Sequence, residues 1–341
     1  MTPDEISQLA FLLYPDVVKS KPDAVLTESL AQRIRRLQDG LEPEDEFAAT
    51  VAWLGNCAAI HRLDQTPIPL PVLGEKMRAP DFIAFPMVCG KAFPVLVEVK
   101  SHHGAYLGWS ESYLNSLRAF SDCTRLPLLV AWKCGALWFL VDHSHFKKNV
   151  TAYRLELATA VVEDLYCVLF RNLRIQMHPE LEFILDMEII DEMPGNKDTL
   201  LPDGTIGMKI AHAGYYRSGK EIKDYDHKFS WLAFSTPDEA ELRRTGKQTC
   251  QQIFRPLADE GFELSNVLTT RLSIQRGDEP IDWHSVLRQG EFGSSGRKFR
   301  ALLQGAIDKG FVRYVFDIIP RTWPSFLPDQ QKVLEEHDGV K

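Results

Sequence analysis

Residues 79–101 read APDFIAFPMVCGKAFPVLVEVKS, and this stretch decides the fold that we expect. Two apolar runs rich in β-branched residues flank the sequence CGK at residues 89–91. That is the pattern of two strands joined by a turn. Side chains alternate between the two faces of a strand, so Val95, Val97 and Val99 are expected to point together into a core.

Three charged residues interrupt these apolar runs: Asp81, Glu98 and Lys100. Burying a charge without a partner is costly, so each needs a partner or a role. Glu98 and Lys100 point to the same face, ~7 Å apart along the strand, and Asp81 can reach this edge from the neighbouring strand. Two carboxylates and several waters commonly hold Mg²⁺, and a lysine beside them can orient a water or stabilise negative charge. The alternative is a structural ion pair between Glu98 and Lys100.

Pro80-Asp81, followed after the turn by Glu98-Val99-Lys100, resembles the motif of the PD-(D/E)xK nuclease superfamily. This superfamily includes restriction endonucleases and Holliday-junction resolvases. The resemblance implies a nuclease that depends on Mg²⁺, with Mn²⁺ as a substitute, and that hydrolyses phosphodiester bonds, with DNA as the expected substrate. It also implies that Asp81 and Glu98 hold the metal, that the backbone carbonyl of Val99 is a further ligand, and that Lys100 positions the attacking water.

A helix is expected to open at residues 43–46, where acidic residues are favourable at the positive end of the helix dipole. Phe47, Val51 and Leu54 form its apolar stripe. In the resembled superfamily a helix before the motif strands sometimes contributes a further metal-site acid, and Glu46 is the candidate here. The alternative is that Glu46 serves only the helix dipole.

The elements expected between residues 43 and 141 follow the order helix, three strands, helix, two strands. The first of these strands is a proline-rich edge strand over residues 68–73, and the second helix begins after Ser110 as its N-cap. Residues 104–108 are expected to form a loop. This is the core order of the resembled fold, so we expect an α/β protein with a restriction-endonuclease-like mixed β-sheet flanked by helices.

The remaining chain is divided by a polar, turn-rich stretch at residues 194–203. Before it, one helix is expected over residues 159–173. The domains that we expect are an N-terminal helical segment over residues 1–42, a nuclease-like domain over 43–193, a β-rich middle region over 194–253, and an α+β C-terminal domain over 254–341.

The C-terminal domain shows the order helix, turn, helix, strand, which is similar to a winged-helix DNA-binding domain. Arg297, Lys298 and Arg300 lie on its second helix and are predicted to bind nucleic acid. Many small α+β units share this order, so an unrelated unit is the alternative.

The composition is that of an ordinary soluble protein, and no apolar run approaches the ~20 residues of a membrane span. The N-terminus lacks a basic segment followed by an apolar stretch, and the six cysteines form no close pair, so they are expected to be buried free thiols in a cytoplasmic protein. A formal net charge of -8 is unlike a nucleic-acid coat protein but fits an enzyme with a local basic face. A homodimer is compatible with this interpretation, and no membrane partner is expected.

Two other functions remain open from the sequence. One is a non-catalytic nucleic-acid-binding or scaffolding protein that keeps the nuclease fold, although such a protein has no need of the Asp, Glu and Lys trio. The other is a metal-dependent phosphohydrolase that acts on nucleotides and ignores polymers.

Overall fold

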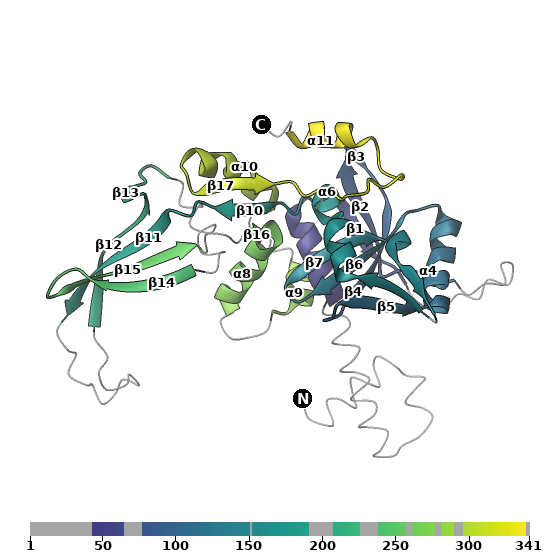
Figure 1. Cartoon of the computed structure of the whole chain (residues 1–341), viewed down its shortest axis with the longest axis horizontal. Coiled ribbons are helices and arrows are strands. Elements are labelled where there is room, and N and C mark those ends of the chain that lie inside the picture. The colour runs from purple at the N-terminus through teal and green to yellow at the C-terminus, as the bar shows by residue number, and fades with distance from the viewer. Residues whose placement is uncertain are drawn as a thin grey trace, which may run out of the picture.

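The computed structural model describes residues 43–64, 77–150, 152–190, 207–225, 238–256, 261–276, 281–289 and 296–338. The helical segment predicted over residues 1–42, the proline-rich strand over 68–73 and the polar stretch over 194–203 lie outside these residues. The molecule is elongated, with a sheet flanked by helices at one end and a long antiparallel sheet at the other (Figure 1). Within the described ranges, no helix has the length and apolar character needed to cross a membrane.

A mixed sheet flanked by helices forms the larger end of the molecule, as expected. Its elements are β1 (Cys57–Arg62), β2 (Phe82–Val88), β3 (Lys91–Ala92), β4 (Val95–Ser101), β6 (Leu128–Cys134) and β7 (Leu137–Asp142), with α4 (Glu111–Thr124) between β4 and β6. The strands pair in the order β1-β2-β4-β6-β7, and β3 pairs with β2. Among the described strands of this sheet, β4 and β6 run parallel and the other pairs are antiparallel. A parallel pair requires a crossover connection, which α4 supplies.

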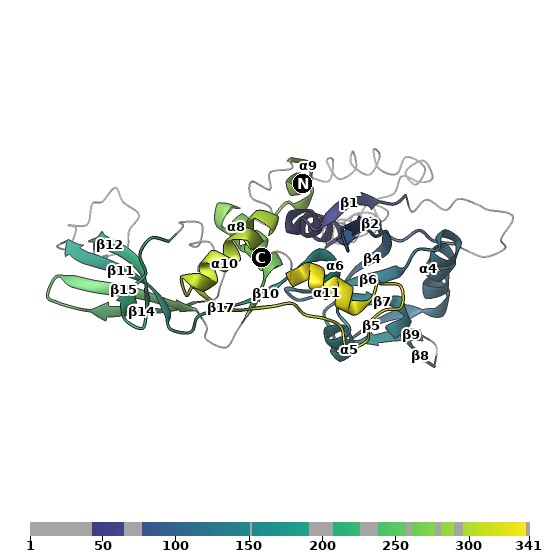
Figure 2. The ribbon, with the colours of Figure 1, turned by 90° about the horizontal axis from the view of Figure 1, so that it is seen from above.

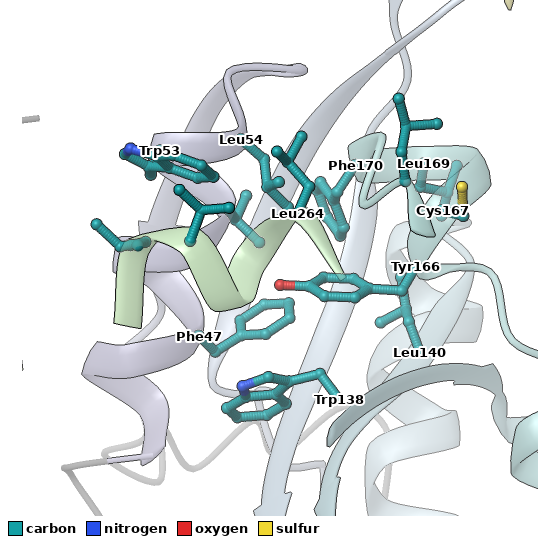
Figure 3. Packing of buried hydrophobic residues seen from close by; sticks show 14 of the residues in the cluster. Phe47, Trp53, Leu54, Trp138, Leu140, Tyr166, Cys167, Leu169, Phe170 and Leu264 are labelled. Carbon is teal, nitrogen blue, oxygen red and sulfur yellow. The ribbon is translucent and has the colours of Figure 1, made fainter. Parts of the chain in front are cut away.

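One face of this sheet packs against the helix over residues 43–54 and against α6 (Tyr166–Phe170). The three valines of β4 that were predicted to enter the core are at most 3% exposed. The predicted helix stripe of Phe47, Val51 and Leu54 is fully buried. Phe47 reaches across to Trp138 of β7, with ring centroids 5.4 Å apart (Figure 3). The face predicted for the valines is therefore confirmed.

The other face of the sheet is covered by α4. Leu96 of β4 belongs to a separate hydrophobic cluster that contains Leu114 and Leu117 of α4. Ser110 caps this helix as predicted, because its hydroxyl accepts a hydrogen bond from the Tyr113 N–H at 3.2 Å. The first turn of α4 therefore lies beside the face of β4 that carries Leu96, Glu98 and Lys100.

A smaller sheet contradicts part of the sequence prediction. Its strands β5 (Tyr106–Ser110), β9 (Ala152–Glu156) and β8 (Lys147–Asn149) pair in the order β5-β9-β8, after the short 3-10 helix η1 (His143–His145). The sequence predicted a loop over residues 104–108, but residues 106–108 belong to β5. The partner of β5 lies far away in sequence, so the local pattern carries little information about this pairing. The same reason accounts for β1, which the sequence did not predict.

The helix predicted over residues 159–173 is divided into α5 (Leu157–Val162) and α6. Side chains at the break explain why it does not continue. Asp164 accepts hydrogen bonds at Oδ1 from the backbone N–H groups of Leu140 at 2.8 Å and Tyr166 at 3.0 Å. Glu163, which is 1% exposed, accepts from Arg321 near the C-terminus. An acidic side chain that binds backbone N–H groups competes with helix continuation.

The other end of the molecule is a five-stranded antiparallel sheet with the order β13-β12-β11-β15-β14, and a three-stranded sheet with the order β16-β10-β17 connects it to the larger end. The bounds are β10 (Arg174–Met177), β11 (Leu181–Ile190), β12 (Gly207–Arg217), β13 (Lys220–Glu221), β14 (Asp238–Arg244), β15 (Thr249–Pro256), β16 (Phe262–Glu263) and β17 (Val312–Phe316). The helices of this part are α8 (Leu264–Arg276), α9 (Trp283–Gln289), α10 (Gly296–Asp308) and α11 (Gln330–Asp338).

Strand pairing links the regions that the sequence divided. β11 pairs with β12 and β15, so strands from both sides of position 194 belong to one sheet. The order α9, α10, β17 agrees with the expected helix, helix, strand order. However, β17 pairs with β10, which comes from the region predicted as the nuclease-like domain. The winged-helix assignment and the domain boundaries therefore stay predictions.

The C-terminal helices share the core of the larger end. Leu264, Phe299 and Val333 belong to the same hydrophobic cluster as Phe47. The approach of α10 to the helix over residues 43–54 is close, because a Cβ atom at Gly296 would lie 2.9 Å from Leu54 Cα. The C-terminal helices thus support the helix that packs beneath the motif strands.

All six cysteines, which lie in the described part of the chain, are free thiols, as expected. Only Cys167 and Cys250 are buried, however, and Cys123 is exposed near the end of α4. The prediction that the cysteines are buried therefore holds for Cys167 and Cys250 alone, and it is wrong for Cys123, which lies on the face of α4 opposite to the buried Leu114.

Candidate active site

Asp81 and Glu98 lie side by side at one end of the β2–β4 pair. The strand register pairs Phe82 with Val97, so Asp81 and Glu98 stand at the next position along this antiparallel ladder. Asp81 Oδ2 accepts a hydrogen bond from the Val99 N–H at 2.7 Å, which holds the carboxylate against β4. Asp81 is 3% exposed and Glu98 is 0% exposed. The structure thus brings together the two carboxylates that the sequence singled out.

Lys100 joins both carboxylates. Its Nζ lies 2.5 Å from Glu98 Oε1 and 3.9 Å from Asp81 Oδ2. Burial lowers the pKa of Lys100, but the two carboxylates raise it by more, so the pKa lies above its usual value. The amine is therefore positively charged at neutral pH.

Tyr113 is a site residue that was not predicted from the sequence. It lies in the first turn of α4, and its hydroxyl donates a hydrogen bond to Glu98 Oε1. Burial and the Glu98 charge raise the pKa of Tyr113, so it remains a donor. The only signal in the sequence was the Ser110 cap, which places this turn after the motif but does not show which side chain faces β4.

One oxygen of Glu98 has no hydrogen-bond partner among the residues that the structure describes. Tyr113 and Lys100 both contact Oε1, whereas Oε2 is buried and receives no hydrogen bond from these residues. Burial raises the pKa of Glu98, and the Lys100 charge opposes that shift. Buried polar atoms are rarely left without a partner, and such an exception calls for an explanation such as an ion.

The helix over residues 43–54 brings Glu44, rather than the predicted Glu46, into the electrostatic neighbourhood of this site. Burial, and secondly the Asp81 charge, raise the pKa of Glu44 to about 7, while Arg62 and Lys100 lower it. Glu44 also forms an ion pair with Arg62 at the end of β1.

Glu46 has different partners. Its carboxylate forms an ion pair with Lys133 of β6 and accepts a hydrogen bond from Trp138 Nε1 of β7 at 3.2 Å. Both oxygens of the Glu46 carboxylate therefore have partners on β6 and β7. Glu46 thus has partners within the fold, whereas the charges of Asp81 and Lys100 act on Glu44. A role of Glu46 in metal binding stays a prediction.

A pocket of about 460 Å³ adjoins the charged cluster. Lys100 and Tyr113 form part of its wall, so two of the side chains that contact Glu98 face it. Backbone contacts fix the end of β4 in this wall, because Lys133 O accepts from the His102 N–H at 3.0 Å. The lining residues are Lys100, Ser101, His102, Leu107, Gly108, Trp109, Ser110 and Tyr113.

The predicted nucleic-acid-binding residues lie elsewhere, on α10. Arg297 donates to Gly55 O at 2.9 Å and Arg300 donates to Leu54 O at 2.8 Å. These carbonyls end the helix over residues 43–54, where cationic side chains are favourable. Burial and the nearby Arg171 lower the pKa of Arg300 to about 10. Lys298 is exposed. Arg297 and Arg300 thus cap a helix. A role of Arg297, Lys298 and Arg300 in nucleic-acid binding stays a prediction.

The residues present fit a hard divalent cation in part. Asp81 and Glu98 offer carboxylate oxygens, which Mg²⁺ prefers, and Glu98 Oε2 is the unpartnered atom. Among the described residues, no group of three or more His, Cys, Asp or Glu side chains is arranged to hold a metal ion. Waters and substrate oxygens would therefore complete the coordination, as is usual for Mg²⁺.

No protein-family model matches this chain, and no curated protein matches it. Among solved structures, it is similar to Hjc, a Holliday junction resolvase from the archaeal hyperthermophile Archaeoglobus fulgidus, with a TM-score of 0.31 and 16% sequence identity. The match covers 38% of this chain and 95% of that chain. Similarity at this level establishes no activity for this chain.

Proposed function

We propose that this protein is a Mg²⁺-dependent nuclease of the PD-(D/E)xK type that hydrolyses phosphodiester bonds in DNA. The observation that carries the proposal is Glu98, a fully buried carboxylate whose Oε2 has no hydrogen-bond partner among the described residues. It lies beside Asp81 and Lys100, and the charged Lys100 lines the pocket. A structural ion pair explains Glu98 Oε1 but not the buried Oε2.

In this proposal Asp81 and Glu98 would hold the metal, with the Val99 carbonyl as a further ligand. A bound divalent metal polarises the phosphate and stabilises the leaving oxygen. Tyr113 and the Val99 N–H orient the two carboxylates through the hydrogen bonds described above. Lys100 is positively charged, so it would orient the attacking water and offset negative charge at the phosphate rather than remove a proton.

The proposed activity is tested by incubating the purified chain with Mg²⁺, Mn²⁺ or EDTA and with supercoiled, linear, single-stranded and branched DNA, an RNA, and free nucleotides. Cleavage of DNA that requires the divalent metal is the expected result. Hydrolysis of nucleotides alone would instead favour the phosphohydrolase. Metal-independent binding without any cleavage would favour the scaffolding protein.

We also propose that Glu44 strengthens Mg²⁺ binding through its negative charge beside the site, without being a direct ligand. Glu44→Gln is expected to weaken Mg²⁺ binding roughly 10-fold, because one of three nearby negative charges is removed. Glu46→Gln is the matched control, because it neutralises an acid two residues away on the same helix. It is expected to leave Mg²⁺ affinity unchanged and to lower the thermal unfolding temperature, since the ion pair with Lys133 is broken. Calorimetric Mg²⁺ titration and thermal unfolding separate the two effects. Equal Mg²⁺ affinities for the two variants would remove Glu44 from the site.

A further inference from the structure

The small sheet beside the candidate active site carries a second pocket, of about 270 Å³. Three of its lining side chains are cationic, against one carboxylate, in a chain whose net charge is -8. A local concentration of positive charge on an acidic protein attracts anionic ligands. The lining residues are Tyr106, His145, Lys147, Lys148, Asn149, Arg154, Glu156 and Thr159.

Strand register aligns two of these cations across one face of the sheet. Gly108 of β5 pairs with Arg154 of β9, which pairs with Lys147 of β8. All three residues are exposed. Lys148 is different, because it pairs with Tyr153 in the register and forms an ion pair with Glu111 at 2.7 Å.

Arg154 is held in place without being neutralised. Its guanidinium lies over the Tyr106 ring, 4.4 Å from the ring centroid. This cation–π contact orients the group and leaves its N–H donors available. Within the described ranges, no carboxylate forms an ion pair with Arg154 or Lys147. A planar guanidinium fixed in this way is suited to bind phosphate through two donors.

The two pockets share strand β5. Residues 107–110 line the larger pocket beside Lys100, and Tyr106 lines the smaller one. Figure 2 shows β5, β9 and β8 as neighbouring strands beside the central sheet. Strands lie ~4.8 Å apart, so Arg154 and Lys147 stand roughly 5 and 10 Å beyond Gly108. A nucleic-acid strand carries regularly spaced phosphates, so cations placed one strand apart can contact neighbouring phosphates of one backbone.

We propose that the pocket formed by Arg154, Lys147 and Tyr106 binds the phosphate backbone of the nucleic-acid strand whose scissile phosphodiester lies beside Lys100. The proposal rests on the proposed nuclease function. Arg154 and Lys147 are positioning residues that hold the strand a few nucleotides from the site of cleavage. Tyr106, which is 44% exposed, offers an aromatic surface against which a sugar or base packs.

The test uses the full chain and the double variant Arg154→Gln with Lys147→Gln. Both side chains are exposed, so the fold should be unaffected. The control is Arg313→Gln with Lys332→Gln, which removes the same charge from exposed sites on β17 and α11, including a cation–π arginine over Tyr314. Binding of fluorescein-labelled DNA is measured by anisotropy in Ca²⁺, which replaces Mg²⁺ so that binding is read without cleavage.

We expect the Arg154 and Lys147 variant to bind DNA ~10-fold or more weakly. The slope of log affinity against log salt concentration should become shallower by roughly 0.9 for each phosphate that the variant no longer neutralises. The control should keep the affinity and the salt slope of the parent. In Mg²⁺, the cleavage rate at saturating DNA should be unchanged, because these residues do not touch the reacting phosphate.

The outcomes separate this inference from the proposed function. If the parent binds DNA, and the variant and the parent share one affinity and one salt slope, the second pocket is not a phosphate site, whether or not the parent cleaves. If the variant alone loses affinity but the parent never cleaves, the pocket binds nucleic acid and the nuclease proposal is wrong. A parent that binds no nucleic acid overturns the inference.

Discussion

Glu98→Gln and Asp81→Asn are each expected to abolish Mg²⁺-dependent cleavage, with the rate falling by roughly 10³-fold or more. A metal contributes several kcal/mol of transition-state stabilisation, and about 1.4 kcal/mol corresponds to a tenfold change in rate. Each substitution removes one of the two buried carboxylate charges that would hold the metal. Mg²⁺ affinity, measured by calorimetric titration, should fall together with the rate.

The fold should survive both changes. Asn at position 81 keeps an oxygen for the Val99 N–H, and Gln at position 98 keeps an oxygen for the Tyr113 hydroxyl. Near-ultraviolet circular dichroism and thermal unfolding check this point. Glu241→Gln is the control, because it neutralises a half-buried carboxylate on β14 that pairs with Arg243 and Arg255, far from the site in the fold (Figure 1). If the position 81 and 98 variants cleave as fast as this control, the cluster is a structural ion-pair network.

Lys100→Met is expected to slow cleavage by ~10²–10³-fold, the usual contribution of one preorganised group that stabilises developing negative charge. Like lysine, methionine has an unbranched side chain, so the packing of the aliphatic part of this side chain beside Tyr113 is preserved. The effect should appear in the single-turnover rate constant at saturating DNA rather than in DNA affinity, because Lys100 is expected to act at the reacting phosphate.

Mg²⁺ binding provides the internal control for this variant. Removing a cation that lies 2.5 Å from Glu98 and 3.9 Å from Asp81 leaves two carboxylates without their nearest positive charge. The affinity for Mg²⁺ should therefore be retained or increased. A variant that loses Mg²⁺ binding, or that cleaves at the parent rate, contradicts the role of Lys100 as a group that acts on water and phosphate.

Local sequence was sufficient for the core of the fold and for the central trio of the site. The alternation of valines with Glu98 and Lys100 follows from the period of a strand, which is a property of the chain itself. The buried stripe of the first described helix and the cap at Ser110 are local in the same sense, because they depend on residues within a few positions of one another. These features were therefore predictable from the sequence.

Only the tertiary structure decided which acidic residue of the helix over residues 43–54 lies toward the candidate site. Glu44 and Glu46 lie about 200° apart around a helix, so only one of them can face Asp81. The rotation of the helix is fixed by the packing of Phe47, Val51 and Leu54 against the sheet and α6. The sequence shows that these residues are buried, but not the angle at which their helix crosses the sheet.

The remaining differences between the sequence predictions and the structure share one physical cause, which is contact between residues far apart in the chain. Tyr113 meets Glu98 because α4 crosses β4, and Arg300 caps a helix that ends 246 positions earlier. The pairing of β5 with β9 turns an expected loop into the strand that separates two pockets. Periodicity and spacing establish which side chains share a face. Which faces meet depends on packing over the whole chain, so the surroundings of the trio were determined by the tertiary structure.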